Sequence, residues 1–230
     1  MKNEQYKICA VTGHRPSGFP WDYNNKECDE HKEYLQTMEE TLEKLISEKG
    51  YNYFIAGGAI GVDTDFAETV LRLRESKYPN IKLEIAVPCE NQDLKWNQSD
   101  KDKYRQILSQ ADFVNVLSKH YTRFCMAKRN EYMVNKSDVV LAFWNVKITK
   151  GGTYRTLKYM NRKKIEYEII GLDDFLPENK RIDALLYSLA DEFKSKMEQE
   201  NLLPNSERFK KFLIEEGLLH STSEKNDCNK

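Results

Sequence analysis

The chain has 230 residues, of which 32% are charged and 40% hydrophobic, and its formal net charge at pH 7 is -1. That length supports one hydrophobic core and a small appendage. The charge balance gives no bulk attraction to nucleic acid, which we do not expect as a partner, although it leaves a local basic patch possible. No apolar run approaches the roughly 20 residues that span a membrane, and no signal peptide follows Met1. We expect a cytoplasmic protein that has no membrane partner.

The cysteines are odd in number and widely spaced. They stand at Cys9, Cys28, Cys89, Cys125 and Cys228. No pair has the CxxC spacing of a structural zinc site, so we expect no metal. Free thiols in a reducing compartment are the simplest interpretation.

Apolar runs alternate with amphipathic segments along the first three quarters of the chain. In chain order the pattern predicts a strand at 6–11, a loop at 13–29, a helix at 30–49 that Gly50 ends, a strand at 51–56 and a helix at 63–78. It continues with a strand at 81–87, a helix capped by Ser99 and ending at 111, a strand at 113–117, a helix at 126–135, a strand at 139–144, a helix at 154–162 and a strand at 165–170. This regular alternation predicts an α/β fold, a Rossmann-like parallel sheet with helices on both faces.

The pattern changes beyond Asp174. A long helix is predicted at 177–200 with an apolar stripe, and Pro204 opens a second helix that ends at Gly217. We divide the chain into a Rossmann-like ligand domain at 1–174, a C-terminal helical pair at 175–220 and a polar, disordered tail at 221–230. The helical pair could pack on the sheet domain or mediate self-association, so a homo-oligomer is possible.

Two glycine-rich turns, each between a predicted strand and a predicted helix, are the strongest functional signal. They supply the candidate ligand-binding residues Gly57, Gly58, Ala59, Gly61, Val62 and Asp63 in one turn, and Gly151, Gly152 and Thr153 in the other. Such a junction offers backbone N–H groups at the positive end of a helix dipole, which suits a phosphate. Asp63 could either complement that dipole or accept hydrogen bonds from ribose hydroxyls.

Other strand ends supply the remaining candidates. They are Thr12, Gly13, His14 and Arg15 after the first strand, Pro88, Glu90, Asn91, Gln92 and Trp96 after the third, and Arg129 and Asn130 in a helix whose Met126 and Met133 should face the core. In a parallel sheet these ends meet at one edge, where ligands bind. The competing interpretations are a structural turn at 12–16 and a polar loop anchored by Trp96. For Cys89 we favour a buried thiol over a nucleophile.

The ordered motifs together resemble the SLOG superfamily, in particular its YpsA-like branch. They are TGHRP at 12–16, GGAIGVD at 57–63, PCENQ at 88–92, KRNEYM at 128–133 and GGTYRTLKYM at 151–160. The resemblance covers about residues 6–170. It implies a Rossmann-like fold, a pocket for nucleotide-derived ligands, and roles in signalling, stress or phage conflict.

Three functions follow. The leading hypothesis is a protein that senses or sequesters a nucleoside phosphate or an ADP-ribose-like ligand. The resemblance to the LOG branch suggests a nucleoside 5′-monophosphate phosphoribohydrolase using Arg129, but Lys158 and Tyr159 stand where that branch carries its carboxylate. The resemblance to the DprA branch suggests a protein that binds single-stranded DNA. The chain has neither GxGxxG nor a P-loop, so no cofactor is expected.

Overall fold

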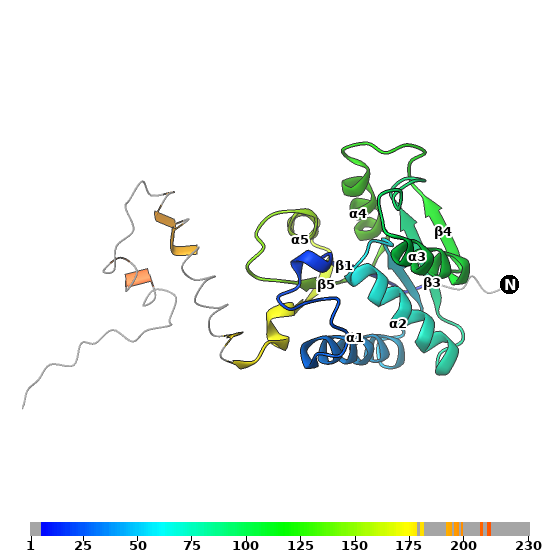
Figure 1. Ribbon diagram of the computed structural model, residues 1–230, viewed down its shortest axis with the longest axis horizontal. Helices are drawn as coiled ribbons and strands as arrows, with labels where there is room; N and C mark the ends of the chain where they lie inside the picture. Colours follow the sequence, from blue (N-terminus) through cyan, green and yellow to red (C-terminus); the bar gives the residue numbers. More distant parts are fainter. Residues whose placement is uncertain are drawn as a thin grey trace, which may run out of the picture. The chain divides into compact units, whose positions relative to one another are not determined.

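The computed structural model describes residues 6–178 without a break and, beyond them, residues 180, 181, 192–194, 196, 197, 199, 208, 211 and 212 (Figure 1). The chain forms two compact units, one ending at Pro177 and the other beginning at Glu178. In the second unit Phe193, Met197 and Phe212 are buried together. Most of the predicted helices at 177–200 and after Pro204, and the whole tail at 221–230, lie outside the described residues.

The first unit is built on one six-stranded sheet in which every pairing is parallel. Its strands are β1 (Ile8–Gly13), β2 (Tyr53–Ala56), β3 (Lys82–Val87), β4 (Phe113–Val116), β5 (Val139–Trp144) and β6 (Glu166–Gly171). Their order is β4-β3-β2-β1-β5-β6. The chain builds outward from β1 to β4 and then returns to the other side of β1, so the switch point lies between β1 and β5. The predicted Rossmann-like α/β fold is confirmed.

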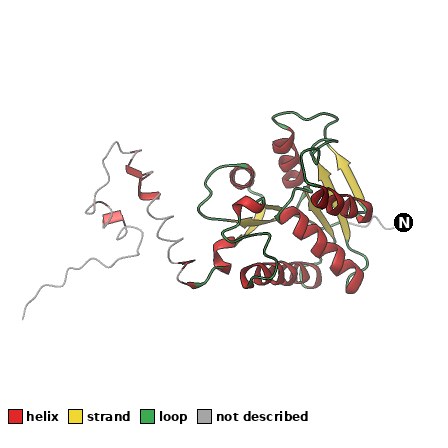
Figure 2. Ribbon diagram, in the orientation of Figure 1, coloured by secondary structure: helices red, strands yellow, loops and turns green. Residues whose placement is uncertain are grey.

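Helices cover both faces of the sheet (Figure 2). On one face lie α1 (Asp29–Ser47), α2 (Val62–Ser76) and α3 (Gln98–Gln110), and on the other lie α4 (Cys125–Lys136) and α5 (Gly152–Lys163). The predicted cap of α3 is wrong by two residues: the side-chain oxygen of Asn97 accepts the N–H of Asp100 at 2.9 Å. Among the helices of the described residues, none has the length and apolarity that crossing a bilayer requires.

The long segment before α1 is ordered by its aromatic side chains. Phe19 and Tyr23 are buried in the core beneath α1 and α2. The hydroxyls of Tyr23 and Tyr34 donate to the buried carboxylate of Asp65 at 2.9 and 3.1 Å. Burial raises the pKa of the Asp65 carboxyl to about 6, although these hydrogen bonds and the nearby Lys26 act against that rise. The predicted loop therefore contributes two aromatic side chains, Phe19 and Tyr23, to the core.

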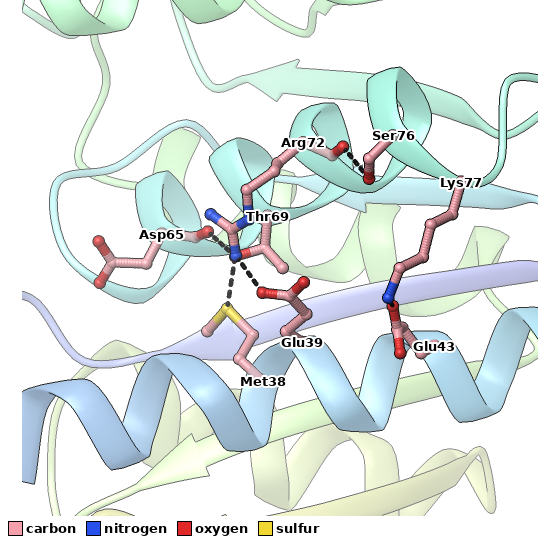
Figure 3. Close-up of polar contacts among 8 residues, drawn as sticks. All are labelled: Met38, Glu39, Glu43, Asp65, Thr69, Arg72, Ser76 and Lys77. Carbon is pink, nitrogen blue, oxygen red and sulfur yellow. Dashed lines mark hydrogen bonds and ion pairs between the residues drawn. The ribbon is translucent and has the colours of Figure 1, made fainter.

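Polar contacts join α1 to α2 along their exposed edge (Figure 3). Arg72 donates to Glu39 at 2.6 Å, and Lys77 pairs with Glu43. Inside this edge the Thr69 hydroxyl of α2 lies 3.8 Å from the sulfur of Met38 in α1. The partly exposed ion pairs each add little stability, but they join the two helices along the same line as the buried contacts.

A buried polar network fixes α4 on the other face of the sheet. The carboxylate of Glu84 in β3 accepts hydrogen bonds from Lys136 at 2.5 Å, Tyr132 at 2.6 Å and Tyr53 at 2.5 Å. Burial alone would raise the pKa of Glu84, but these donors hold it below its ordinary value. Because Lys136 lies two turns along α4 from Arg129, this anchor also sets where Arg129 points.

Candidate functional site

A cleft of about 390 Å³ opens at the switch point, beyond the carboxyl ends of β1 and β5. The end of β1 and the residues after it, the starts of α2 and α5, and one side of α4 form its walls. It is lined by Val11, Thr12, Gly13, His14, Arg15, Ser17, Gly18, Ala59, Ile60, Asp63, Met126, Arg129, Asn130, Met133, Ile148, Lys150, Gly151, Gly152 and Thr153. Both glycine-rich turns therefore contribute to one cavity.

The N-terminus of α5 is open to this cleft. Gly151 has φ 98°, a conformation that favours glycine, and no side chain caps the helix. The Thr153 hydroxyl donates to the backbone oxygen of Gly13 at 2.8 Å, which fixes the turn against β1. A Cβ at Gly152 would meet no atom within 4 Å. The first amides of α5 are therefore positioned to accept an anion.

The N-terminus of α2 is different because it already has a negative group. The N–H of Val62 donates to the backbone oxygen of His14 at 3.2 Å. The carboxylate of Asp63 accepts the N–H of Ala59 at 3.2 Å and the guanidinium of Arg129 at 2.9 Å. Of the two interpretations of Asp63, this geometry favours the one in which its charge complements the helix dipole.

Arg129 is the most constrained cation in the cleft. It is 8% exposed and pairs with Asp63, while its Nε atom has no hydrogen-bond partner among the described residues. A Cβ at Gly57 would lie 1.3 Å from Nη1 of Arg129. Glycine at this position therefore leaves room for the guanidinium, whereas the sequence places Gly57 among the candidate ligand-binding residues.

His14 presents a second unpaired nitrogen. Its side chain is buried, and Nε2 has no hydrogen-bond partner among the described residues. Burial lowers the pKa of His14 to about 4, so the imidazole is neutral at pH 7. A buried polar atom without a partner costs stability. His14 Nε2 and Arg129 Nε, both on cleft-lining residues, are suited to hydrogen bonds with a ligand.

Eleven of the twenty predicted site residues line the cleft. The other nine, which do not, are Gly57, Gly58, Gly61, Val62, Pro88, Glu90, Asn91, Gln92 and Trp96. The amide nitrogen of Gln92 donates to the backbone oxygen of Gly58 at 3.1 Å, and the Trp96 ring packs edge-on against Tyr104 at 5.3 Å. These two side chains stabilise the loop after β3.

The cleft also contains residues that the predicted set lacks. They are Val11, Ser17, Gly18, Ile60, Met126, Met133, Ile148 and Lys150. Met126 lines the cleft and is only partly buried, so its assignment to the core is wrong, whereas Met133 is buried as expected. Lys150 stands directly before the second glycine turn, and this position could have marked it as a residue of the cleft. Nothing in the sequence marked Ser17.

Two expectations concern cysteines and metals. Cys89 is fully buried and is not part of the cleft lining, as expected for a thiol without a catalytic role. Burial raises the pKa of the Cys89 thiol, which further lowers its reactivity.

The described residues contain no group of three or more His, Cys, Asp or Glu side chains placed to hold a metal ion.

The fold and the cleft define the class: an α/β Rossmann-like protein with a charged cavity at the switch point of its sheet. A family model described as the YspA SLOG family, and named YpsA, matches residues 9–175. The chain belongs to this family.

Three relatives illustrate the range of similarity. A UPF0398 protein of Bacillus pumilus is 30% identical over 173 residues, which are 73% of this chain and 89% of the relative. The SPbeta prophage-derived protein YoqJ of Bacillus subtilis is 31% identical over 56% of this chain and 80% of its own length. A UPF0398 protein of Shouchella clausii is 34% identical over 49% of this chain and 61% of its own length.

Proposed function

We propose that the cleft binds a nucleotide-derived small molecule, with a phosphate at the N-terminus of α5. The observation that carries the proposal is the uncapped helix end in the same cavity as two buried nitrogens, His14 Nε2 and Arg129 Nε, which have no hydrogen-bond partner among the described residues. Helix amides bind phosphate, and neutral imidazole can donate to or accept from a sugar hydroxyl or a base edge. ADP-ribose-like molecules, nucleoside phosphates and signalling nucleotides all have these parts.

The charges of the lining support an anionic ligand. Arg15, Arg129 and Lys150 supply three positive charges, and Asp63 is the one carboxylate among the described cleft-lining residues. Arg15 and Lys150 are exposed at the cleft, whereas Arg129 is buried against Asp63. A ligand with a phosphate group can therefore be neutralised by these exposed cations without breaking the buried pair.

Calorimetry with a panel of nucleotides tests the proposal, using Gly152→Glu and a matched Gly152→Gln variant. Both side chains enter open space, so both variants should fold like the wild type. The glutamate places a negative charge at the helix N-terminus and should abolish binding, whereas the glutamine should weaken it far less. No binding by the wild type, or equal affinities of the two variants, would refute the proposal.

The same mixtures test the hydrolase alternative, because a phosphoribohydrolase would release free base from a nucleotide. Asp63 is the carboxylate available to such a reaction in the cleft, and it is already paired with Arg129. Chromatography after long incubation separates the two functions. Base release that Arg129→Ala abolishes would favour the enzyme, and intact nucleotide would favour the binding protein.

A further inference from the structure

Positive charge is concentrated in one part of the chain. Residues 119–164 contain twelve of the 36 lysines and arginines but only two of the 37 acidic residues. The net charge of the whole chain is only -1 because the rest of the chain is acidic and offsets this basic segment. The segment includes α4, β5 and α5, so much of the charge belongs to the helices on one face of the sheet.

A groove of about 590 Å³ between α4 and α5 gathers part of this charge. We call it the basic groove; it is lined by Arg123, Met126, Ala127, Asn130, Glu131, Gly152, Arg155, Thr156, Lys158, Tyr159, Asn161 and Arg162. Met126, Asn130 and Gly152 also line the cleft. The basic groove therefore begins where the proposed phosphate site ends, and a ligand could extend from one into the other.

The cations of the basic groove form no ion pair within the described part of the chain. Arg155, Lys158 and Arg162 are exposed and form no ion pair with any residue that the structure describes. They lie at positions i, i+3 and i+7 of α5, on one side of the helix. Glu131 is the one carboxylate among the described residues of the lining. By contrast, the basic residues Arg72 and Lys77 of α2 pair with acidic partners on α1.

Aromatic side chains lie beside two cations of the basic groove, Arg123 and Arg162. The guanidinium of Arg123 lies 4.5 Å from the ring centroid of Phe124, and that of Arg162 lies 5.9 Å from the ring of Tyr159. Phe124 is 54% exposed, and nearby in the sequence Tyr121 is 70% exposed. Exposed aromatic rings beside a row of cations are the combination that binds single strands, because bases stack while phosphates are neutralised.

We propose that the basic groove binds a short single strand of nucleic acid that continues from the nucleotide in the cleft. Phosphates of the strand contact Arg155, Lys158 and Arg162 along α5, and a base stacks on Phe124. The proposal rests on the proposed function for the terminal nucleotide, and it identifies the ligand class as an oligonucleotide with a terminal phosphate.

The test compares a 5′-phosphorylated single-stranded octamer with the corresponding mononucleotide, by fluorescence anisotropy and calorimetry on the full chain. The double variant Arg155→Glu/Arg162→Glu should weaken octamer binding at least tenfold. It should also reduce the slope of log affinity against log salt by about 1.4, for two lost phosphate contacts. Mononucleotide affinity should change less than twofold, because the open end of α5 is intact. Phe124→Ala should weaken octamer binding by roughly tenfold.

Lys101→Glu/Arg105→Glu is the matched control, because both residues lie on α3 across the sheet and the charge change is the same, with two cations replaced by two carboxylates. Three results would overturn the inference: an octamer that binds no tighter than the mononucleotide, equal losses in the α3 and α5 variants, or an inorganic polyphosphate that binds as tightly as the octamer. Octamer binding without mononucleotide binding would leave the basic groove as a site and refute the function proposed for the cleft.

Discussion

Replacing Asp65 by asparagine should change how the stability of the protein depends on pH. The carboxyl of Asp65 is buried between Tyr23 and Tyr34, and burial raises its pKa from 3.8 to about 6. The folded state therefore binds the proton more tightly than the unfolded state does. The folded protein loses relative stability as the pH rises from about 4 to 6, and above pH 6 the full cost is present.

The expected size follows from the two pKa values. A shift from 3.8 to about 6 corresponds to about 3 kcal/mol, most of which appears between pH 4 and pH 7. Asparagine is nearly the same size and does not ionise. The difference in unfolding free energy, variant minus wild type, should therefore rise by about 2 kcal/mol over that range. His14 and His31, whose pKa values burial lowers to about 4, also titrate on unfolding, but they are common to both proteins and cancel.

Urea unfolding at half-unit pH steps measures this difference. Asp112→Asn is the control, because the pKa of Asp112 is lowered: burial opposes the shift, but the backbone N–H of Leu83 and the cations Lys82 and Arg74 outweigh it. The stability that Asp112 contributes is lost only as the pH falls below the ordinary pKa of an aspartate. For this control, the difference in unfolding free energy between variant and wild type should therefore stay constant above pH 5. A flat profile for Asp65→Asn between pH 4 and pH 7 would show that the site is better solvated than the structure indicates.

Three further predictions concern the cleft and the thiols. Gly57→Ala should displace the guanidinium of Arg129 from its buried ion pair and lower the unfolding free energy by about 3 kcal/mol; unchanged stability in urea would contradict the close contact. The ring of His14 should titrate by NMR near pH 4, and a midpoint near 6.5 would show that the ring is solvated. Iodoacetamide should modify the partly exposed Cys28 well before the buried Cys89, and equal rates in peptide mass spectrometry would contradict that difference in burial.

Local patterns were sufficient to predict the strands and helices of the sheet domain. The strand at 139–144 was placed to the residue, because a continuous apolar run between polar ends can form only a buried element there. The edge strand β4 was also found, although Phe113 and Val114 are exposed in the structure. The sequence predicted the ends of helices less accurately than the strands. At the start of α3, Asn97 and Ser99 both have side chains that can cap a helix, and the folded backbone determines which of them accepts a free N–H.

The site was predicted less completely, for a physical reason. A polar side chain at a strand end can bind a ligand or the neighbouring backbone, and the sequence does not distinguish these partners. Gln92 donates to the backbone oxygen of Gly58, so a residue predicted to bind the ligand stabilises a turn. Conversely, the shared cleft of the turns at 57–63 and 151–153 follows from the parallel sheet, whose strand ends meet at one edge.

The two helix N-termini at the cleft are similar in sequence but differ in their charge. The α2 terminus carries Asp63, which repels a second anion, and the first amide of α2 is already bonded to the oxygen of His14. The α5 terminus carries no acidic residue in its first turn and no capping side chain. Under the proposed function, this difference sets the direction of a phosphorylated ligand, with its phosphate at Gly152 and its neutral, hydrogen-bonding part between His14 and Asp63. A phosphate in the opposite direction would meet the α2 terminus, where the N–H of Val62 is bonded to His14 and Asp63 already complements the helix dipole.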